Sequence, residues 1–214
     1  MTTDRTIELS HVRAADGGAR LLLHIQISQG EQASREILTA FAARLPCVPQ
    51  CGVLSECEYE GLVAEDQMTK ALDMGLRLLG AGAVSQVRLI QKMQQRGVGK
   101  EIATAAAAEL FARGYADETA GALREAEKGI GKLWGNRRIL LDVRAKGYGD
   151  AALAAVKKFL LAQNAVKRCE KLIARRRMTL PLTEADASRF VTSLVRYGYT
   201  VHEIKQAISQ KNEH

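Results

Sequence analysis

The sequence predicts a mainly α protein, an elongated, curved tandem array of three three-helix units preceded by a small N-terminal module. The first observation is a helix-ending phrase that occurs three times, at residues 88–98, 138–148 and 189–199. The glycines of this phrase, Gly97, Gly147 and Gly198, lie 50 and 51 positions apart. A fixed period near fifty indicates stacked supersecondary units. The second observation is composition, because three prolines and 5% aromatic residues favour helices over an all-β or disordered chain.

The N-terminal module, residues 1–63, is expected to hold a β-hairpin and one helix. Apolar residues alternate from Thr6 to Ile27 around Asp16-Gly17-Gly18, a turn typical of a hairpin. Ser28 and Glu31 then form a capping-box pattern, which predicts that a helix begins there. The apolar positions that follow share one helical face: Ile37, Leu38, Phe41 and Leu45. A loop from Pro46 to Leu62 is expected to end the module.

From about Ala64 onward, the sequence predicts nine helices in three consecutive units, at 64–114, 115–164 and 165–214. In the first unit, one helix ends near Gly80, a second begins at Ser85 and closes at Gly97, and a third runs from about Lys100 to Arg113. The second unit repeats this plan near 117–130, 135–146 and 150–164, and the third near 165–178, 183–197 and 200–210. Thr183 with Asp186, and Thr200 with Glu203, resemble capping boxes. Helices this short depend on packing against neighbours.

The net charge of +7 is unevenly distributed along the chain. Residues 1–66 hold 5 Lys and Arg against 10 Asp and Glu, whereas residues 123–177 hold 15 against 5. A cationic segment of this kind attracts a polyanion such as nucleic acid, or an acidic protein surface. The sequence therefore predicts that the second and third units carry a binding surface, against the more common alternative of a solvated basic face.

Four phrases lie in a fixed order along residues 66–210. They are Ser85 to Gly97, Gly114-Tyr115-Ala116-Asp117-Glu118, Trp134-Gly135-Asn136-Arg137-Arg138-Ile139 with Arg144-Ala145-Lys146-Gly147, and Arg196-Tyr197-Gly198-Tyr199 with Ile204. In this order and at these separations, they resemble the RecX family of bacterial regulatory proteins, which modulate the RecA recombinase. The N-terminal module resembles an extension that some members carry. Gly121-Ala122 departs from the family, which usually has an aromatic residue followed by alanine there, and we expect a weaker packing contact at that point.

The resemblance implies a non-enzymatic regulator that binds the RecA nucleoprotein filament. Occupying the filament groove would inhibit the recombinase, ATPase and co-protease activities, without any cofactor. The rival hypothesis is an independent DNA-binding protein that acts without RecA, because short helices ending in glycine also resemble helix-turn-helix units. A generic scaffold is a third reading. Single-stranded or double-stranded DNA would meet the basic second and third units, and the protein is expected to be a monomer.

The candidate contact residues are the cations of this basic segment together with the single tryptophan. On a helix, Lys167 or Arg168, Lys171 and Arg175 share a face. Trp134 either stacks on a nucleic-acid base or, as we favour, joins two helical units. Tyr115, Tyr148 and Tyr199 each follow a glycine and are expected to pack between units. The candidates are Trp134, Arg137, Arg138, Arg144, Lys146, Lys157, Lys158, Lys167, Arg168, Lys171, Arg175, Arg176 and Arg177.

Sequence motifs for catalysis are absent: the chain has no phosphate-binding loop, zinc helix or nucleophile elbow. Cys47, Cys51 and Cys57 lack the paired spacing of a zinc site, so we expect reduced thiols and no metal. No apolar run has the length of a membrane span, and the first residues show no secretion signal. The expected location is the cytoplasm.

Overall fold

The computed structural model describes residues 5–30, 32–82, 84–176 and 184–212. The N-terminal module is a four-stranded antiparallel sheet in the order β3-β2-β1-β4. Its strands are β1 (Arg5–Ala15), β2 (Arg20–Gln29), β3 (Gln32–Phe41) and β4 (Gly52–Leu54), with short 3-10 turns at Asp16–Gly18 and Ala42–Arg44. Strands β1 and β2 form the predicted hairpin, and Gly17 and Gly18 in its turn have positive φ, at +67° and +95°.

The predicted helix after the hairpin is wrong, because its residues form β3. This strand pairs along its whole length with β2, from Arg20 opposite Phe41 to Gln29 opposite Gln32. Leu38 and Ala40 therefore face the core, whereas Ile37 lies on the opposite face and is 54% exposed. Ten residues of backbone pairing outweigh a helical apolar pattern of four side chains. The predicted cap residue Glu31 lies outside the described residues.

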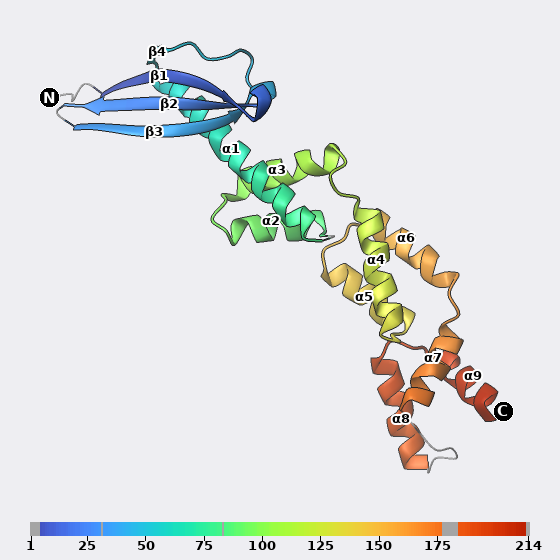
Figure 1. Ribbon diagram of the computed structural model, residues 1–214. Helices are drawn as coiled ribbons and strands as arrows, with labels where there is room; N and C mark the ends of the chain where they lie inside the picture. The colour runs from blue at the N-terminus through green and yellow to red at the C-terminus, as the bar shows by residue number, and fades with distance from the viewer. Residues whose placement is uncertain (1–4, 31, 83, 177–183, 213–214) are drawn as a thin grey trace. The chain divides into compact units, whose positions relative to one another are not determined.

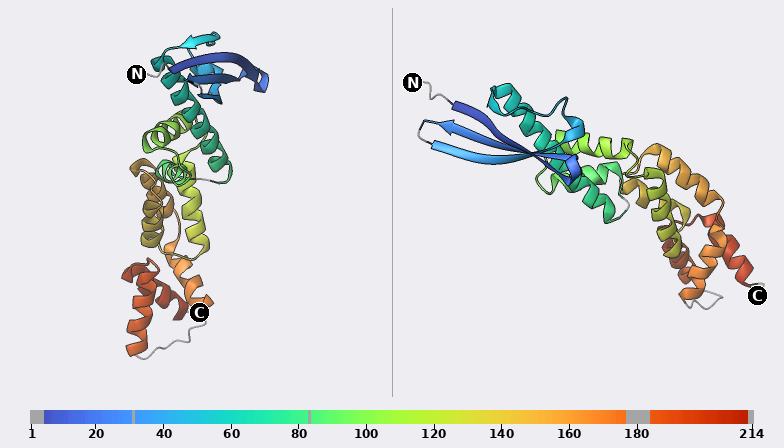
Figure 2. Two further views of the ribbon diagram at one scale, coloured as in Figure 1. Left: turned by 90° about the vertical axis from the view of Figure 1, so that its left-hand side faces the viewer. Right: turned by 45° about the horizontal axis from the view of Figure 1, so that its top comes forward.

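The loop expected from Pro46 to Leu62 is shorter in the structure, because α1 (Glu56–Gly80) begins inside it. Ser55 and Glu58 form a reciprocal cap, in which the Ser55 amide donates to the Glu58 carboxylate at 2.8 Å and the Glu58 amide donates to the Ser55 hydroxyl. Figures 1 and 2 agree in placing the start of α1 against one face of the sheet, where Leu62 joins the core of that module.

Nine helices follow the sheet in the described residues, in three successive groups of three, which confirms the prediction of a mainly helical fold. The first group holds α1, α2 (Gln86–Gln94) and α3 (Lys100–Ala112); the second holds α4 (Glu118–Gly131), α5 (Asn136–Ala145) and α6 (Asp150–Leu161); the third holds α7 (Ala165–Arg175), α8 (Glu184–Arg196) and α9 (Val201–Asn212). The Thr200 and Glu203 cap is present at α9. Thr183 lies outside the described residues.

The three repeated glycines occupy the same place, in the turn that follows the middle helix of each group. Gly97, Gly147 and Gly198 have φ of +89°, +76° and +92°. This left-handed conformation closes a helix and strains any residue with a Cβ atom. The period seen in the sequence therefore repeats in the backbone.

The chain divides into two compact units, and the division passes through α1, α2 and α3. The first comprises residues 1–78 and 92–110, and the second comprises residues 79–91 and 111–214. In the first, Arg44 links the sheet end to α1 and α3 through Glu65 and Glu109. None of the helices in the described ranges is both long and apolar enough to cross a membrane.

The second unit contains two apolar cores, one for each three-helix group. Tyr148 belongs to the core of α4, α5 and α6, together with buried alanines of α4. A Cβ atom at Gly129 of α4 would lie 2.7 Å from Ile139 of α5, so the two helices approach closely there. The second core, in α7, α8 and α9, includes Cys169 and Tyr199.

Candidate interaction surface

The two three-helix groups of the second unit meet through a direct backbone contact. The Gly135 amide donates to the Tyr197 carbonyl at 2.8 Å, and the Arg137 amide donates to the Gly198 carbonyl at 3.2 Å. These amides belong to the start of α5, where a helix has no intrahelical acceptors for its first N–H groups. The turn after α8 therefore serves as the cap of α5.

The same arrangement occurs at the start of α2, within the second compact unit. The Ser85 hydroxyl donates to the Lys146 carbonyl at 2.6 Å, beside Gly147. The Gln86 amide donates to the Glu118 carboxylate at 3.0 Å. A middle helix thus begins on the glycine turn of the following group at both places. These contacts hold the start of each middle helix in place, and with it the basic residues that the helix carries.

Arg168 is a buried residue that joins the two groups. Only 5% of it is exposed, its Nε donates to the Trp134 carbonyl at 2.8 Å, and its terminal nitrogen donates to Asn136. Tyr199 adds a second link, because its hydroxyl donates to the Leu133 carbonyl at 2.9 Å. Burial raises the pKa of Tyr199 well above its ordinary value. Both side chains position the α5 segment.

Cations and aromatic rings alternate across this junction, in a set that we call the ladder: Lys132, Trp134, Arg138, Tyr197 and Arg176. Lys132 and Arg138 lie 4.7 and 4.4 Å from the centre of the Trp134 ring. Arg138 also lies over Tyr197, and Arg176 lies 4.5 Å from the centre of that ring. Cation–π contacts of this length hold the guanidinium groups in place.

Arg176 has two further effects within the ladder. Its guanidinium donates to the Ser193 hydroxyl at 2.7 Å, and its hydrogen bond to Tyr197 lowers the pKa of that phenol. Trp134 is half-buried and packs against the α4, α5 and α6 core, and its carbonyl accepts a hydrogen bond from Arg168 of α7, so it contacts both groups. Tyr148 is buried in the core of its own group and Tyr199 lies at the junction, whereas Tyr115 is 56% exposed.

Lys146 lies between two carboxylates instead of facing solvent alone. Its ammonium group donates to Glu125 and Asp142, at 2.5 and 2.6 Å. Burial works to lower the pKa of Lys146, but the hydrogen bonds and charges of these two acids outweigh it and raise the pKa. Lys146 therefore carries its charge in a network that connects α4 with α5.

The remaining candidate cations are exposed and are distributed over α5, α6 and α7. Lys167, Lys171 and Arg175 follow one another at four-residue intervals on α7 and share a face, as predicted, while the adjacent Arg168 points inward. Arg177 lies outside the described residues. The exposed candidates are Arg137, Arg144, Lys157, Lys158, Lys167, Lys171 and Arg175.

Sequence reasoning missed two members of the ladder, Lys132 and Tyr197. Lys132 lies two residues before Trp134, and Tyr197 belongs to the third copy of the repeated phrase. The middle helices α2 and α5 each begin on the glycine turn of the following group. The repeated phrase that contains Tyr197 could therefore have placed the Tyr197 ring beside Arg138.

The fold and these contacts define a helical-repeat protein with a cationic surface on its second and third groups. A solved structure of the regulatory protein RecX has a TM-score of 0.72 and 17% sequence identity, covering 95% of this chain and 99% of that one. The structure of RecX from Lactobacillus salivarius has a TM-score of 0.61 and 14% identity, covering 70% and 99%. No family model and no curated protein matches the sequence. The chain therefore has the RecX fold, which bears out the resemblance seen in its phrases.

Proposed function

We propose that this protein is a RecX-type regulator that binds the RecA nucleoprotein filament. Bound in the filament groove, it inhibits the recombinase, ATPase and co-protease activities. The observation that carries this proposal is the match of nearly the whole chain to a solved RecX structure, at a TM-score of 0.72. The protein acts as a cytoplasmic monomer, by surface contact and without catalysis.

The exposed cations supply the contact surface in this proposal. Arg137 lies on α5, Lys157 and Lys158 lie on α6, and Lys171 and Arg175 lie on α7, each exposed. A planar guanidinium binds two oxygens of a phosphate or carboxylate, and an ammonium group acts as a point charge toward either. Many modest contacts of this kind favour a long polyanionic partner over a small ligand.

Co-sedimentation with RecA on single-stranded DNA tests the proposal. We expect the protein to pellet with the filament and to lower its DNA-dependent ATP hydrolysis. The double variant Arg137→Glu/Arg175→Glu is expected to weaken both effects by about tenfold, since each reversal replaces an attraction with a repulsion. Arg13→Glu/Arg35→Glu, which changes two exposed cations of the sheet module, is the matched control.

The proposal fails if the unchanged protein stays in the supernatant with RecA filaments present. If the protein pellets but both double variants behave like the unchanged chain, Arg137 and Arg175 are removed from the contact surface. Circular dichroism of every variant separates loss of contact from loss of fold.

The second candidate function is DNA binding without RecA, and the ladder is the observation that favours it. Trp134 is half-buried, and a base stacked on an exposed part of such a ring contributes about 1–3 kcal/mol. Equal affinity for naked DNA and for RecA-coated DNA would favour this candidate. Tighter binding to the coated DNA supports the regulator.

A further inference from the structure

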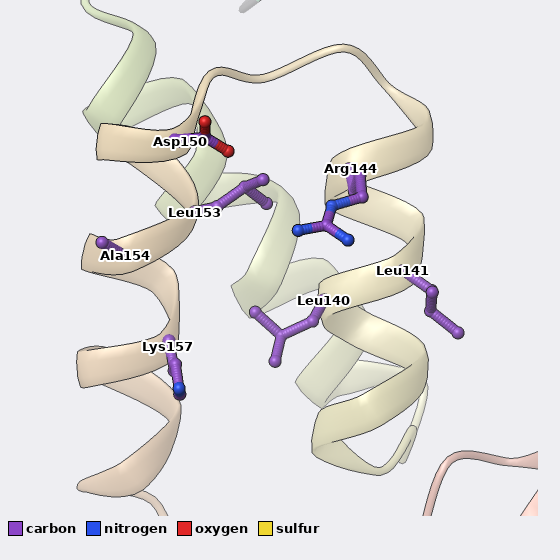
Figure 3. Close-up of a pocket in the computed structure, with 7 residues that line it drawn as sticks. All are labelled: Leu140, Leu141, Arg144, Asp150, Leu153, Ala154 and Lys157. Carbon is purple, nitrogen blue, oxygen red and sulfur yellow. The ribbon is translucent and has the colours of Figure 1, made fainter.

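An open groove runs between α5 and α6 on the second three-helix group. Its volume is about 360 Å³, and Figure 3 shows the two helices that form its walls. The residues that line it are Leu140, Leu141 and Arg144 of α5, with Asp150, Leu153, Ala154 and Lys157 of α6.

The floor of the groove is aliphatic. Figure 3 shows Leu140 and Leu153 pointing into the gap between the helices, while Leu141 projects from the outer side of α5. Leu141 is 65% exposed, and Leu161 at the end of α6 is 76% exposed. The Asn136 side-chain amide donates to the Leu160 carbonyl at 3.5 Å, which places this end of α6 beside the start of α5. The groove therefore presents aliphatic side chains from both of its walls, Leu140 of α5 and Leu153 of α6.

Cations border this apolar floor. Figure 3 shows the Arg144 guanidinium reaching into the gap, and Lys157 extends from the facing helix. Within the described residues, neither Arg144 nor Lys157 forms an ion pair, in contrast to the nearby Lys146. Asp150 at the start of α6 is the one carboxylate in the lining. The groove therefore combines two available positive charges, leucine side chains and one negative end.

We propose that this groove binds an acidic amphipathic segment of a protein partner. The segment inserts a leucine-like side chain over Leu140 and Leu153 and places carboxylates opposite Arg144 and Lys157. Its neutral or basic end lies toward Asp150, since a carboxylate there would be repelled. The inference rests on the proposed function in taking the protein part of the filament as the source of the segment.

A protein segment fits the groove better than nucleic acid does. Phosphates would pair with Arg144 and Lys157, but they would leave the aliphatic floor of Leu140 and Leu153 in water. Aromatic rings are the side chains on which bases stack, and the lining contains none. An amphipathic helix satisfies both halves of the lining, since its apolar face lies in a hydrophobic groove while its charged flanks reach the rim.

The test uses a short synthetic helical peptide that carries leucines on one face and glutamates beside them. A matched peptide replaces each glutamate by glutamine, and a single-stranded oligonucleotide is the third probe. Binding to the full chain is followed by the methyl NMR signals of Leu140, Leu141 and Leu153. We expect the acidic peptide to shift these signals, and we expect the glutamine peptide to bind about tenfold more weakly.

Two charge-reversed variants complete the test. Arg144→Glu/Lys157→Glu is expected to weaken binding of the acidic peptide by at least about tenfold. Arg13→Glu/Arg124→Glu reverses two exposed cations outside the lining and is expected to stay within about twofold, because charges at a distance are screened. Unshifted leucine methyl signals, or equal binding of the two peptides, overturn the inference. An oligonucleotide that shifts the same signals more strongly than the acidic peptide assigns the groove to nucleic acid instead.

The peptide test needs no RecA, so it separates this inference from the proposed function. If the peptide binds the groove and the protein does not pellet with RecA filaments, the groove has a different protein partner. If the protein pellets normally and the peptide fails, the filament is bound through other surfaces and the inference falls alone.

Discussion

A Cβ atom built on Gly135 would lie 2.2 Å from the carbonyl carbon of Gly198, so the start of α5 and the turn after α8 touch backbone to backbone. The amide of Gly135 donates across the same contact to the Tyr197 carbonyl. A side chain on either glycine would separate these groups and break the hydrogen bonds that cap α5. The contact holds the ladder together, because Trp134 and Arg138 flank Gly135 while Tyr197 precedes Gly198.

Replacing Gly135 by alanine is expected to lower the free energy of unfolding by about 2–3 kcal/mol, because the new methyl group meets rigid backbone. Gly131→Ala is the matched control, since a Cβ there meets nothing within 4 Å and lies in the last turn of α4. Urea denaturation followed by circular dichroism measures both variants. A Gly135→Ala protein as stable as the control would mean that the two backbones do not meet in solution.

Gly147 and Gly97 allow a second comparison of two alanine variants. Both glycines have the same backbone conformation, but only Gly147 has other atoms close to the position of a Cβ atom. Alanine at either position would have to adopt a positive φ, which lowers the free energy of unfolding by about 1 kcal/mol. At Gly147 the new methyl group would also lie 3.0 Å from Cβ of Val87, whereas at Gly97 it meets nothing within 4 Å. We therefore expect Gly147→Ala to lower the thermal midpoint more than Gly97→Ala does. Equal midpoints would show that the start of α2 does not rest on this turn.

The helical array was predictable because its signals are local. Gly97, Gly147 and Gly198 each end a helix through their own φ, and Thr200 caps α9 through a residue three positions away. The strand β3 was not predictable in this way, since its pairing with β2 is a tertiary contact that a helical apolar pattern conceals. Ile37 and Leu38 adjoin on a predicted helical face, yet they lie on opposite faces of the sheet.

Arg168 is expected to stabilise the second compact unit through its bonds to Trp134 and Asn136. Arg168→Ala leaves the partly buried Trp134 carbonyl without this donor, and we expect a loss of about 2 kcal/mol in the free energy of unfolding. The exposed neighbour Lys167→Ala should change it by less than about 0.5 kcal/mol. Fluorescence of Trp134, the single tryptophan, reports the same junction and should shift only in the Arg168 variant.

The contrast between Lys167 and Arg168 also shows that the sequence alone does not tell which basic residues are exposed on the binding surface. Lys167 and Arg168 both suit the spacing of a basic helical face, and only the fold decides that Lys167 points to solvent and Arg168 to Trp134. The ladder shows the same limit, since Arg138 meets Tyr197 from a distant part of the chain. Charge content could be read from the sequence, whereas the division into structural and available cations required the packing.

Burial of Cys169 predicts a loss of stability at alkaline pH. Desolvation raises the pKa of this thiol from 9.0 to about 12, so the folded chain keeps the proton that the unfolded chain loses. The stabilisation is complete below the unfolded pKa and is lost as the pH rises toward about 12. Between about pH 8 and about pH 10, we expect Cys169 to account for about 1 kcal/mol of the decrease.

Urea denaturation at these two pH values measures that decrease. The variant Cys169→Ala should lose less stability between them than the unchanged chain, whatever its stability at the lower pH. Both proteins retain the other titrating groups, including Tyr199 and Lys146, so the difference belongs to the thiol. Identical decreases in the two proteins would contradict the assignment.

Salt dependence separates phosphate contact from contact with an acidic protein surface on α7. If Lys167, Lys171 and Arg175 each meet a phosphate, replacing all three by glutamine should reduce the log–log salt slope for naked single-stranded DNA by about 2. We expect this reduction, because the three exposed side chains repeat along one helical face and can follow a backbone. Changing Arg13, Arg35 and Arg124 to glutamine, all exposed and outside this face, is the matched control and should leave the slope unchanged. An unaltered slope in the α7 variant, together with weaker pelleting on RecA filaments, would assign this face to the protein component of the filament instead of to DNA.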